Sequence, residues 1–136
     1  MICLDTNAVI ALLNRSSAPV RAQLAAAAHR REVVAISVVV LFELHYGAAK
    51  SADRQRASRR IADFLSGPVK VLDFEPDDAE EAGDIRAALE RAGTPIGPYA
   101  VLIAGQARRR RAVLVTANLR EFARVPRLKT EDWTAD

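Results

Sequence analysis

The chain has 136 residues, of which 50% are hydrophobic and 27% charged, with a formal net charge of +3. This length suffices for one domain with its own core, and the apolar fraction excludes an intrinsically disordered chain. No apolar run approaches the roughly 18 residues of a membrane span, and an acid already at position 5 argues against a secretory leader. The single cysteine, Cys3, lies among apolar residues, so we expect a buried thiol in a cytoplasmic protein.

The first half of the sequence alternates between short β-branched runs and helical patterns. In chain order the patterns predict a strand over 1–4, a helix over 8–13, a helix beginning near 17–19, a strand over 33–36, a helix over 38–49 capped by Ser37, and a helix that ends before Gly67 and Pro68. This alternation is typical of βαβ units around a parallel sheet.

The second half continues the alternation without a repeat, a linker or a low-complexity segment. The patterns predict a strand over 69–74, a helix from Pro76 to near Gly93, a loop to Pro98 followed by another helix, a strand over 113–115, a short helix over 118–122, and a last short strand around Leu128 and Trp133. We therefore expect a single α/β domain over residues 1–136.

Arginines crowd two segments of the chain. One holds Arg54, Arg56, Arg59 and Arg60, and the other is the unbroken run 108–111. Such groups can hold phosphates as sequence-independent counter-charges. The alternative is that both groups lie on solvated helix faces, the second also complementing a helix C-terminal dipole. The arginines alone do not decide between these interpretations.

Polar side chains follow three of the predicted strands. Asp5, Thr6 and Asn7 follow the first strand, Glu43 lies in the helix after the second, and Thr116, Asn118 and Glu121 follow the strand over 113–115. Because sites in parallel sheets gather outside the carboxyl ends of the strands, we expect these side chains to converge.

Three of these residues are acids, and each alone has an ordinary explanation. Asp5 can cap the next helix, and Glu43, in an apolar segment that predicts a largely buried helix, can pair with an arginine. Together with Glu121 they predict an oxygen-rich cluster that requires Mg²⁺ or Mn²⁺. Zinc is disfavoured because His29 and His45 lack ligand spacing. The sequence contains no Gly-rich phosphate loop and no nucleophile motif.

Four motifs stand in order along the chain: Leu4-Asp5-Thr6-Asn7, Phe42-Glu43-Leu44, Ile96-Gly97-Pro98-Tyr99 and Val115-Thr116-x-Asn118-x-x-Glu121. In this order and spacing the chain resembles the VapC toxins, the PIN-domain ribonucleases of type II toxin–antitoxin systems. The resemblance runs essentially end to end. It implies a three-layer α/β/α fold with a central parallel sheet of about four to five strands.

The resemblance also implies roles for individual residues. Asp5, Glu43 and Glu121 take three places in a set of three or four acids that holds one or two Mg²⁺ or Mn²⁺ ions, and Thr6, Asn7, Thr116 and Asn118 support them. After Pro98-Tyr99 the family has an aspartate, whereas this chain has Ala100. Because the flanking residues are intact, we interpret Ala100 as an inactivating substitution introduced so that a toxic protein can be produced. A naturally altered, weak or non-catalytic member is the alternative.

The function implied is that of a metal-dependent endoribonuclease cleaving structured RNA such as tRNA, with catalysis weak or absent because of Ala100. We expect Arg108, Arg109 and Arg110 to contact the RNA backbone. A cognate VapB-like antitoxin, a homodimer and larger toxin–antitoxin oligomers are expected partners, with DNA bound only through the antitoxin and no membrane association. The alternative is a catalytically inactive PIN-fold module that acts by binding the antitoxin.

A receiver-like signalling domain is a further alternative, since Thr116 and Lys129 superficially suit a phospho-acceptor site. That fold needs an acceptor aspartate after a central strand, and Asp73 is the candidate. The early pair of acids that such a site requires is missing, so we disfavour this reading.

Overall fold

The fold is built on a parallel sheet, seen in a computed structural model that describes residues 1–15 and 17–134. The strands are β1 (Ile2–Leu4), β2 (Val34–Ser37), β3 (Val69–Leu72), β4 (Val113–Val115) and β5 (Lys129–Glu131). Their order in the sheet is β3-β2-β1-β4-β5, and all four pairings are parallel. The expected central sheet is confirmed, with five strands.

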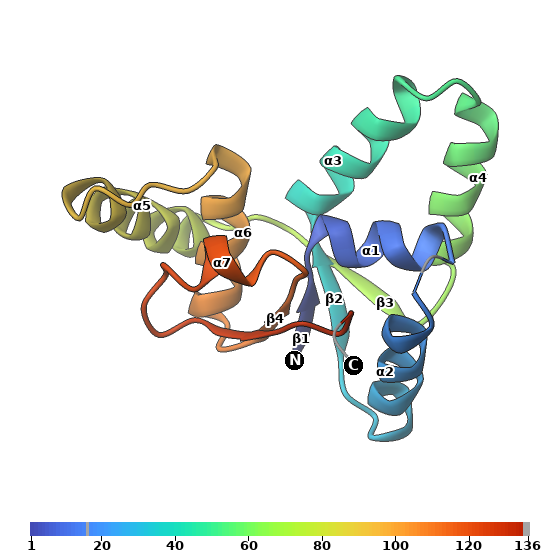
Figure 1. Cartoon of the computed structure of the whole chain (residues 1–136), viewed down its shortest axis with the longest axis horizontal. Helices are drawn as coiled ribbons and strands as arrows, with labels where there is room; N and C mark the ends of the chain where they lie inside the picture. The colour runs from blue at the N-terminus through green and yellow to red at the C-terminus, as the bar shows by residue number, and fades with distance from the viewer. Residues whose placement is uncertain (16, 135–136) are drawn as a thin grey trace.

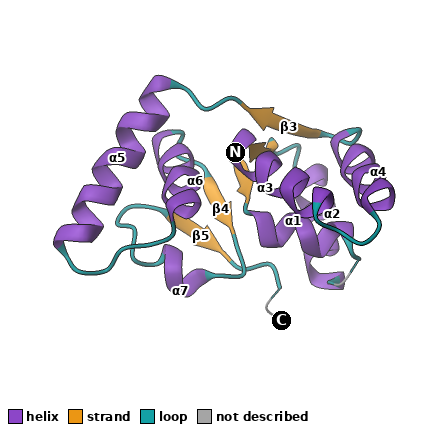
Figure 2. Ribbon diagram, turned by 90° about the horizontal axis from the view of Figure 1, so that it is seen from above, coloured by secondary structure: helices purple, strands orange, loops and turns teal. Residues whose placement is uncertain are grey.

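Helices cover both faces of the sheet, giving the three-layer α/β/α arrangement (Figures 1 and 2). They are α1 (Thr6–Leu13), α2 (Ala18–His29), α3 (Val38–Ala49), α4 (Arg54–Leu65), α5 (Pro76–Arg91), α6 (Pro98–Arg109) and α7 (Leu119–Phe122). The first four pack together on one side, whereas α5 and α6 pair closely on the other. In the described part of the chain, no helix is both long and apolar enough to cross a membrane.

The predicted elements are all present, with small shifts at their ends. Strand β3 ends at Leu72 rather than at residue 74. Helix α1 begins at Thr6 instead of residue 8, because the Asp5 carboxylate accepts a hydrogen bond from the Thr6 N–H and caps the helix. Ser37 caps α3 as expected, accepting from the Val39 N–H at 3.0 Å.

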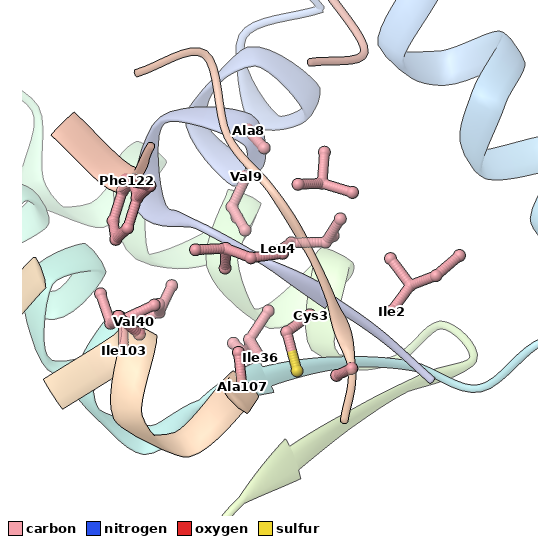
Figure 3. Close-up of a cluster of buried hydrophobic side chains, with 14 of the residues drawn as sticks. Ile2, Cys3, Leu4, Ala8, Val9, Ile36, Val40, Ile103, Ala107 and Phe122 are labelled. Atoms are coloured by element: carbon pink, nitrogen blue, oxygen red, sulfur yellow. The ribbon is translucent and has the colours of Figure 1, made fainter. Parts of the chain in front are cut away.

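The core forms around β1, which is buried along its whole length. Figure 3 shows its side chains between residues of α1 and α6, such as Val9 and Ala107, with Phe122 of α7 nearby. Cys3 belongs to this core, as predicted. Burial raises the pKa of its thiol to about 11, so Cys3 stays neutral and acts as a small apolar side chain.

The direction of winding reverses beside β1. The chain moves outward from β1 to β2 and β3, then returns through α5 and α6 to β4 on the other side of β1. The connections leaving β1 and β4 therefore diverge at the carboxyl ends of these strands, which is where parallel sheets place their sites. Asp5 and Thr116 are the first residues after β1 and β4, so they lie at this edge of the sheet.

The contact between α5 and α6 depends on a glycine. Gly105 of α6 is buried, and a Cβ built on it would lie 2.7 Å from the Cα, Cβ and N atoms of Ala82 in α5. The two helix backbones approach too closely for any side chain at this position. We expect Gly105→Ala to lower the free energy of unfolding by about 3 kcal/mol, because the helices must separate. Urea denaturation followed by circular dichroism measures the change.

Gly83 provides the matched control. It lies in the middle of α5, and a Cβ there would meet nothing within 4 Å. Gly83→Ala should stabilise the protein by about 0.5–1 kcal/mol, because alanine loses less backbone entropy than glycine on forming a helix. Equal effects of the two substitutions would contradict the close approach at Gly105.

Candidate active site

Asp5 is more buried than the other two predicted site acids, with 7% of its surface exposed. One carboxylate oxygen accepts from the Thr6 N–H at 2.8 Å and the other from the Thr116 hydroxyl at 2.9 Å. Burial raises the pKa of Asp5, and the negative charges of Glu43 and Glu121 raise it further, against the lowering effect of the two hydrogen bonds. The charges of both other predicted site acids therefore act on the Asp5 carboxyl.

Glu43 reaches the same region from α3. Its Oε1 accepts a hydrogen bond of 2.7 Å from the Thr6 hydroxyl, next to Asp5 in sequence. Contrary to the sequence prediction, α3 is not largely buried. Its buried residues are Val40, Leu44 and Ala48, whereas Val38, Phe42 and Tyr46 are exposed. The apolar run covers two faces of the helix, and only one of them packs on the core.

Glu121 is positioned by two segments. Its Oε2 accepts from the Gly97 N–H at 3.3 Å, at the start of α6. Its Oε1 accepts from the Asn118 side-chain amide at 3.4 Å. Glu121 is half-buried and links α7 to the N-terminus of α6.

The predicted supporting residues join these acids. Thr116 is fully buried, donates to Asp5 and accepts from the Asn118 N–H at 2.9 Å. The Asn7 side-chain oxygen accepts from the Ala117 N–H at 3.1 Å, which ties the segment after β1 to the segment after β4. The structure therefore brings together Asp5, Glu43 and Glu121 with Thr6, Asn7, Thr116 and Asn118.

Ala100 lies in the first turn of α6, close to Glu121. A Cβ built on Gly97 would be 3.8 Å from Glu121 Oε2 and 3.9 Å from Ala100 Cβ, so both atoms border the same small space. No residue of this first turn is acidic. An aspartate at position 100 would stand beside Glu121, where the positive end of the helix dipole favours a carboxylate.

The donor chemistry of the site fits a hard divalent cation, but the set is incomplete. Carboxylate, hydroxyl and amide oxygens are the ligands preferred by Mg²⁺ and Mn²⁺. Burial, and after it the charges of Glu43 and Glu121, raise the pKa of the Asp5 carboxyl, and a cation bound beside it would oppose this effect. Within residues 1–15 and 17–134, no three His, Cys, Asp or Glu side chains are close enough to hold a metal ion as they stand.

Sequence reasoning missed an aromatic pair at the edge of the site. The rings of Phe42 and Tyr99 have centroids 5.4 Å apart, and both residues are exposed. They immediately precede Glu43 and Ala100, so the pair joins α3 to α6 next to the acids. The signal was available in the sequence, since each is an aromatic residue directly before a site position.

The predicted RNA-contacting arginines lie elsewhere. Arg108, Arg109 and Arg110 are at the C-terminal end of α6, about 12–15 Å along the helix from Ala100. They pair with acids of α5 and its N-cap: Arg108 with Glu81, Arg109 and Arg110 with the fully buried Asp78, and Arg110 also with Glu75. The structure therefore gives these arginines a role in packing α6 on α5 and does not place them beside the acids.

The receiver-like alternative does not fit this topology. Asp73, its candidate acceptor, follows β3, which is an edge strand of the sheet. Its backbone carbonyl accepts hydrogen bonds from Gln106 and Arg110. The acceptor of such a domain would have to follow a central strand, so this reading is wrong.

Comparison with known proteins identifies the family of this fold. The family model described as PIN domain matches residues 2–128. The tRNA(fMet)-specific endonuclease VapC of Shigella flexneri is 43% identical over 131 residues, and that of Salmonella typhimurium is 42% identical over 130 residues, in each case over 96% of both chains.

Solved structures agree with these matches. VapBC2 from Rickettsia felis, bound to a DNA fragment from their promoter, superposes with a TM-score of 0.92 at 35% identity, over 98% of this chain and 99% of that chain. DNA-bound VapBC from Salmonella typhimurium gives 0.89 at 41% identity, over 97% of each chain. The fold is therefore that of a PIN domain. The chain belongs to the PIN-domain family and, within it, to the VapC ribonucleases of VapBC toxin–antitoxin systems.

Proposed function

We propose that the activity built into this fold is divalent-metal-dependent hydrolysis of phosphodiester bonds in tRNA, and that Ala100 leaves this chain with little or none of it. The observation that carries the proposal is the network of hydrogen bonds, through Thr6, Thr116 and Asn118, that links the carboxylates of Asp5, Glu43 and Glu121. The names of the Salmonella and Shigella relatives support tRNA as the substrate class.

The roles of the residues follow from their contacts. Asp5, Glu43 and Glu121 would hold the ion, together with an acid at position 100 when one is present. A divalent ion held there would supply the Lewis acidity that activates water and offsets charge on the leaving oxygen. Thr116 and the Thr6 N–H fix the Asp5 carboxylate, and the Thr6 hydroxyl fixes Glu43, so the acids are oriented before substrate binds.

The proposed partners follow from the neighbouring structures. VapBC complexes, two of them DNA-bound, superpose on this chain over nearly its whole length. We therefore propose a VapB-like antitoxin as the partner of this protein, with DNA bound through the antitoxin. A homodimer and larger toxin–antitoxin assemblies belong to the same proposal. Since tRNA is the proposed substrate, the cytoplasm is the expected location.

A second candidate function is that of a PIN-fold module that binds an antitoxin without cleaving RNA. Ala100 is the feature that favours it. The two candidates differ in what an acid at position 100 would do, because a pure binding module would gain no activity from it.

The test is cleavage of initiator tRNA by the chain as it stands and by Ala100→Asp, each with Mg²⁺, Mn²⁺ or EDTA. We expect the Asp variant to cleave with either metal, EDTA to stop it, and the unchanged chain to cut far more slowly. Adding Asp5→Asn to Ala100→Asp should abolish cleavage and so exclude a contaminating nuclease. If Ala100→Asp cuts no RNA while it still binds the antitoxin, the binding module replaces the nuclease.

A further inference from the structure

A basic groove lies between the end of α1 and α4, away from the arginines first expected to bind RNA. The hollow has a volume of about 600 Å³, and Arg15, Arg56 and Arg60 line it together with Asn14 and Asp63. Three guanidinium groups face one carboxylate here, so the groove carries excess positive charge. This is the chemistry expected of a surface that binds a polyanion.

The guanidinium groups of this groove are available. Among residues 1–15 and 17–134, no ion pair involves Arg15, Arg56 or Arg60. Arg60 donates to the Asn14 side-chain oxygen at 3.2 Å, a neutral contact that positions the side chain without cancelling its charge. The arginines at the end of α6 differ in this respect, because they form ion pairs with acids of α5 and its N-cap.

The groove is continuous with the candidate active site. A second hollow of about 280 Å³ shares Leu13, Asn14 and Arg60 with the first, and Glu43 lines it as well. Arg60 therefore stands at the junction of the two hollows. A strand bound at the acids can leave the site past Glu43, reach Arg60, and continue along α4 to Arg56.

Helix periodicity separates the arginines of α4 into two sets. Arg56 and Arg60 are four residues apart, so they lie on the face of α4 that lines the groove. Arg54 and Arg59 are exposed on the same helix but line neither hollow. These two residues give a control of equal charge and equal helix content.

We propose that this groove binds the phosphates of the RNA segment next to the cleaved bond, with Arg60 nearest the acids and Arg56 and Arg15 further along the strand. This inference rests on the proposed nuclease function and adds the path of the substrate to it. An acidic segment of a protein partner would suit the same charges. The continuity with the catalytic acids favours RNA, because a substrate strand must extend beyond the bond that is cut.

The test is equilibrium binding of fluorescein-labelled initiator tRNA by anisotropy, using the Ala100 chain, between 50 and about 300 mM KCl. Arg56→Ala with Arg60→Ala should weaken binding at least about fivefold and reduce the slope of log Kd against log salt by roughly 1.5, since two phosphate contacts are lost. Arg54→Ala with Arg59→Ala should change affinity less than twofold. Far-ultraviolet circular dichroism checks that both double variants are folded.

The outcomes separate the inference from the function on which it rests. Equal effects of the two double variants, or no effect of either, overturn the proposal that the groove binds RNA. The nuclease function can still stand in that case, if Ala100→Asp cleaves tRNA. Loss of binding to an acidic antitoxin peptide with unchanged tRNA binding assigns the groove to a protein partner and overturns the RNA path. No tRNA binding by the parent chain overturns both the path and tRNA as substrate.

Discussion

Ala100→Asp is expected to strengthen Mn²⁺ binding about a hundredfold. The new carboxylate would stand beside Glu121 in the first turn of α6 and complete the set that Asp5 and Glu43 begin. A charge pair at about 4 Å contributes roughly 4 kcal/mol at an effective dielectric near 20, and a divalent ion doubles that, while desolvation offsets much of the gain. A net gain of about 3 kcal/mol corresponds to the hundredfold change. Titration calorimetry with MnCl₂ measures it.

Ala100→Asn is the matched control, because it has nearly the same shape but no charge. It should leave Mn²⁺ affinity within a few-fold of the parent chain. An equally large gain from asparagine would show that a side-chain oxygen, and not negative charge, is what the site lacks. No gain from aspartate would remove position 100 from the metal site altogether.

Asp78→Ala is expected to lower the free energy of unfolding by about 3 kcal/mol. Asp78 is fully buried and accepts hydrogen bonds from Arg109, Arg110, Gln106 and the Glu75 N–H, where it completes a capping box at the start of α5. Its removal leaves several donors without their acceptor at the contact of α5 with α6. The melting temperature should fall by roughly 10 °C.

Asp77→Ala is the control for this effect. Asp77 is the neighbouring residue, its side chain is 78% exposed, and it reaches Arg109 only at 4.0 Å. Exposed ion pairs contribute little, so this change should cost less than about 0.5 kcal/mol. A loss of stability as large as that of Asp78→Ala would mean that negative charge at the start of α5 stabilises the protein, and not the buried hydrogen-bond network.

The contribution of Asp78 should also depend on pH in a defined direction. Burial alone would raise the pKa of Asp78, but hydrogen bonds from Arg109, the Glu75 N–H and Gln106, together with the charge of Arg110, outweigh it and hold the pKa below its usual value. A depressed carboxyl pKa gives stability that is fully present above the unfolded-state value of about 3.9. The difference between the parent and Asp78→Ala should therefore be constant from pH 7 to 5 and shrink below about pH 4. Urea titrations at each pH measure it.

The sequence by itself determined the secondary-structure elements and predicted which acids lie close together. Short continuous apolar runs indicated strands such as β1 and β4, because a strand that is buried on both faces must be almost entirely apolar. Asp5 was identifiable because it directly follows an apolar strand, at the edge where a parallel sheet forms its sites. Order and spacing of the motifs then pointed to the family.

Only the tertiary structure decided which arginines are available. The two arginine-rich segments look alike in sequence, yet one meets the acids of α5 and its N-cap and the other borders an open groove. Periodicity shows which residues share a helix face but not what lies opposite that face. The same holds for Gly105, whose lack of a side chain matters only because the backbone at Ala82 lies against it. Contacts between segments far apart in the chain come from packing, and packing is not encoded in any local pattern.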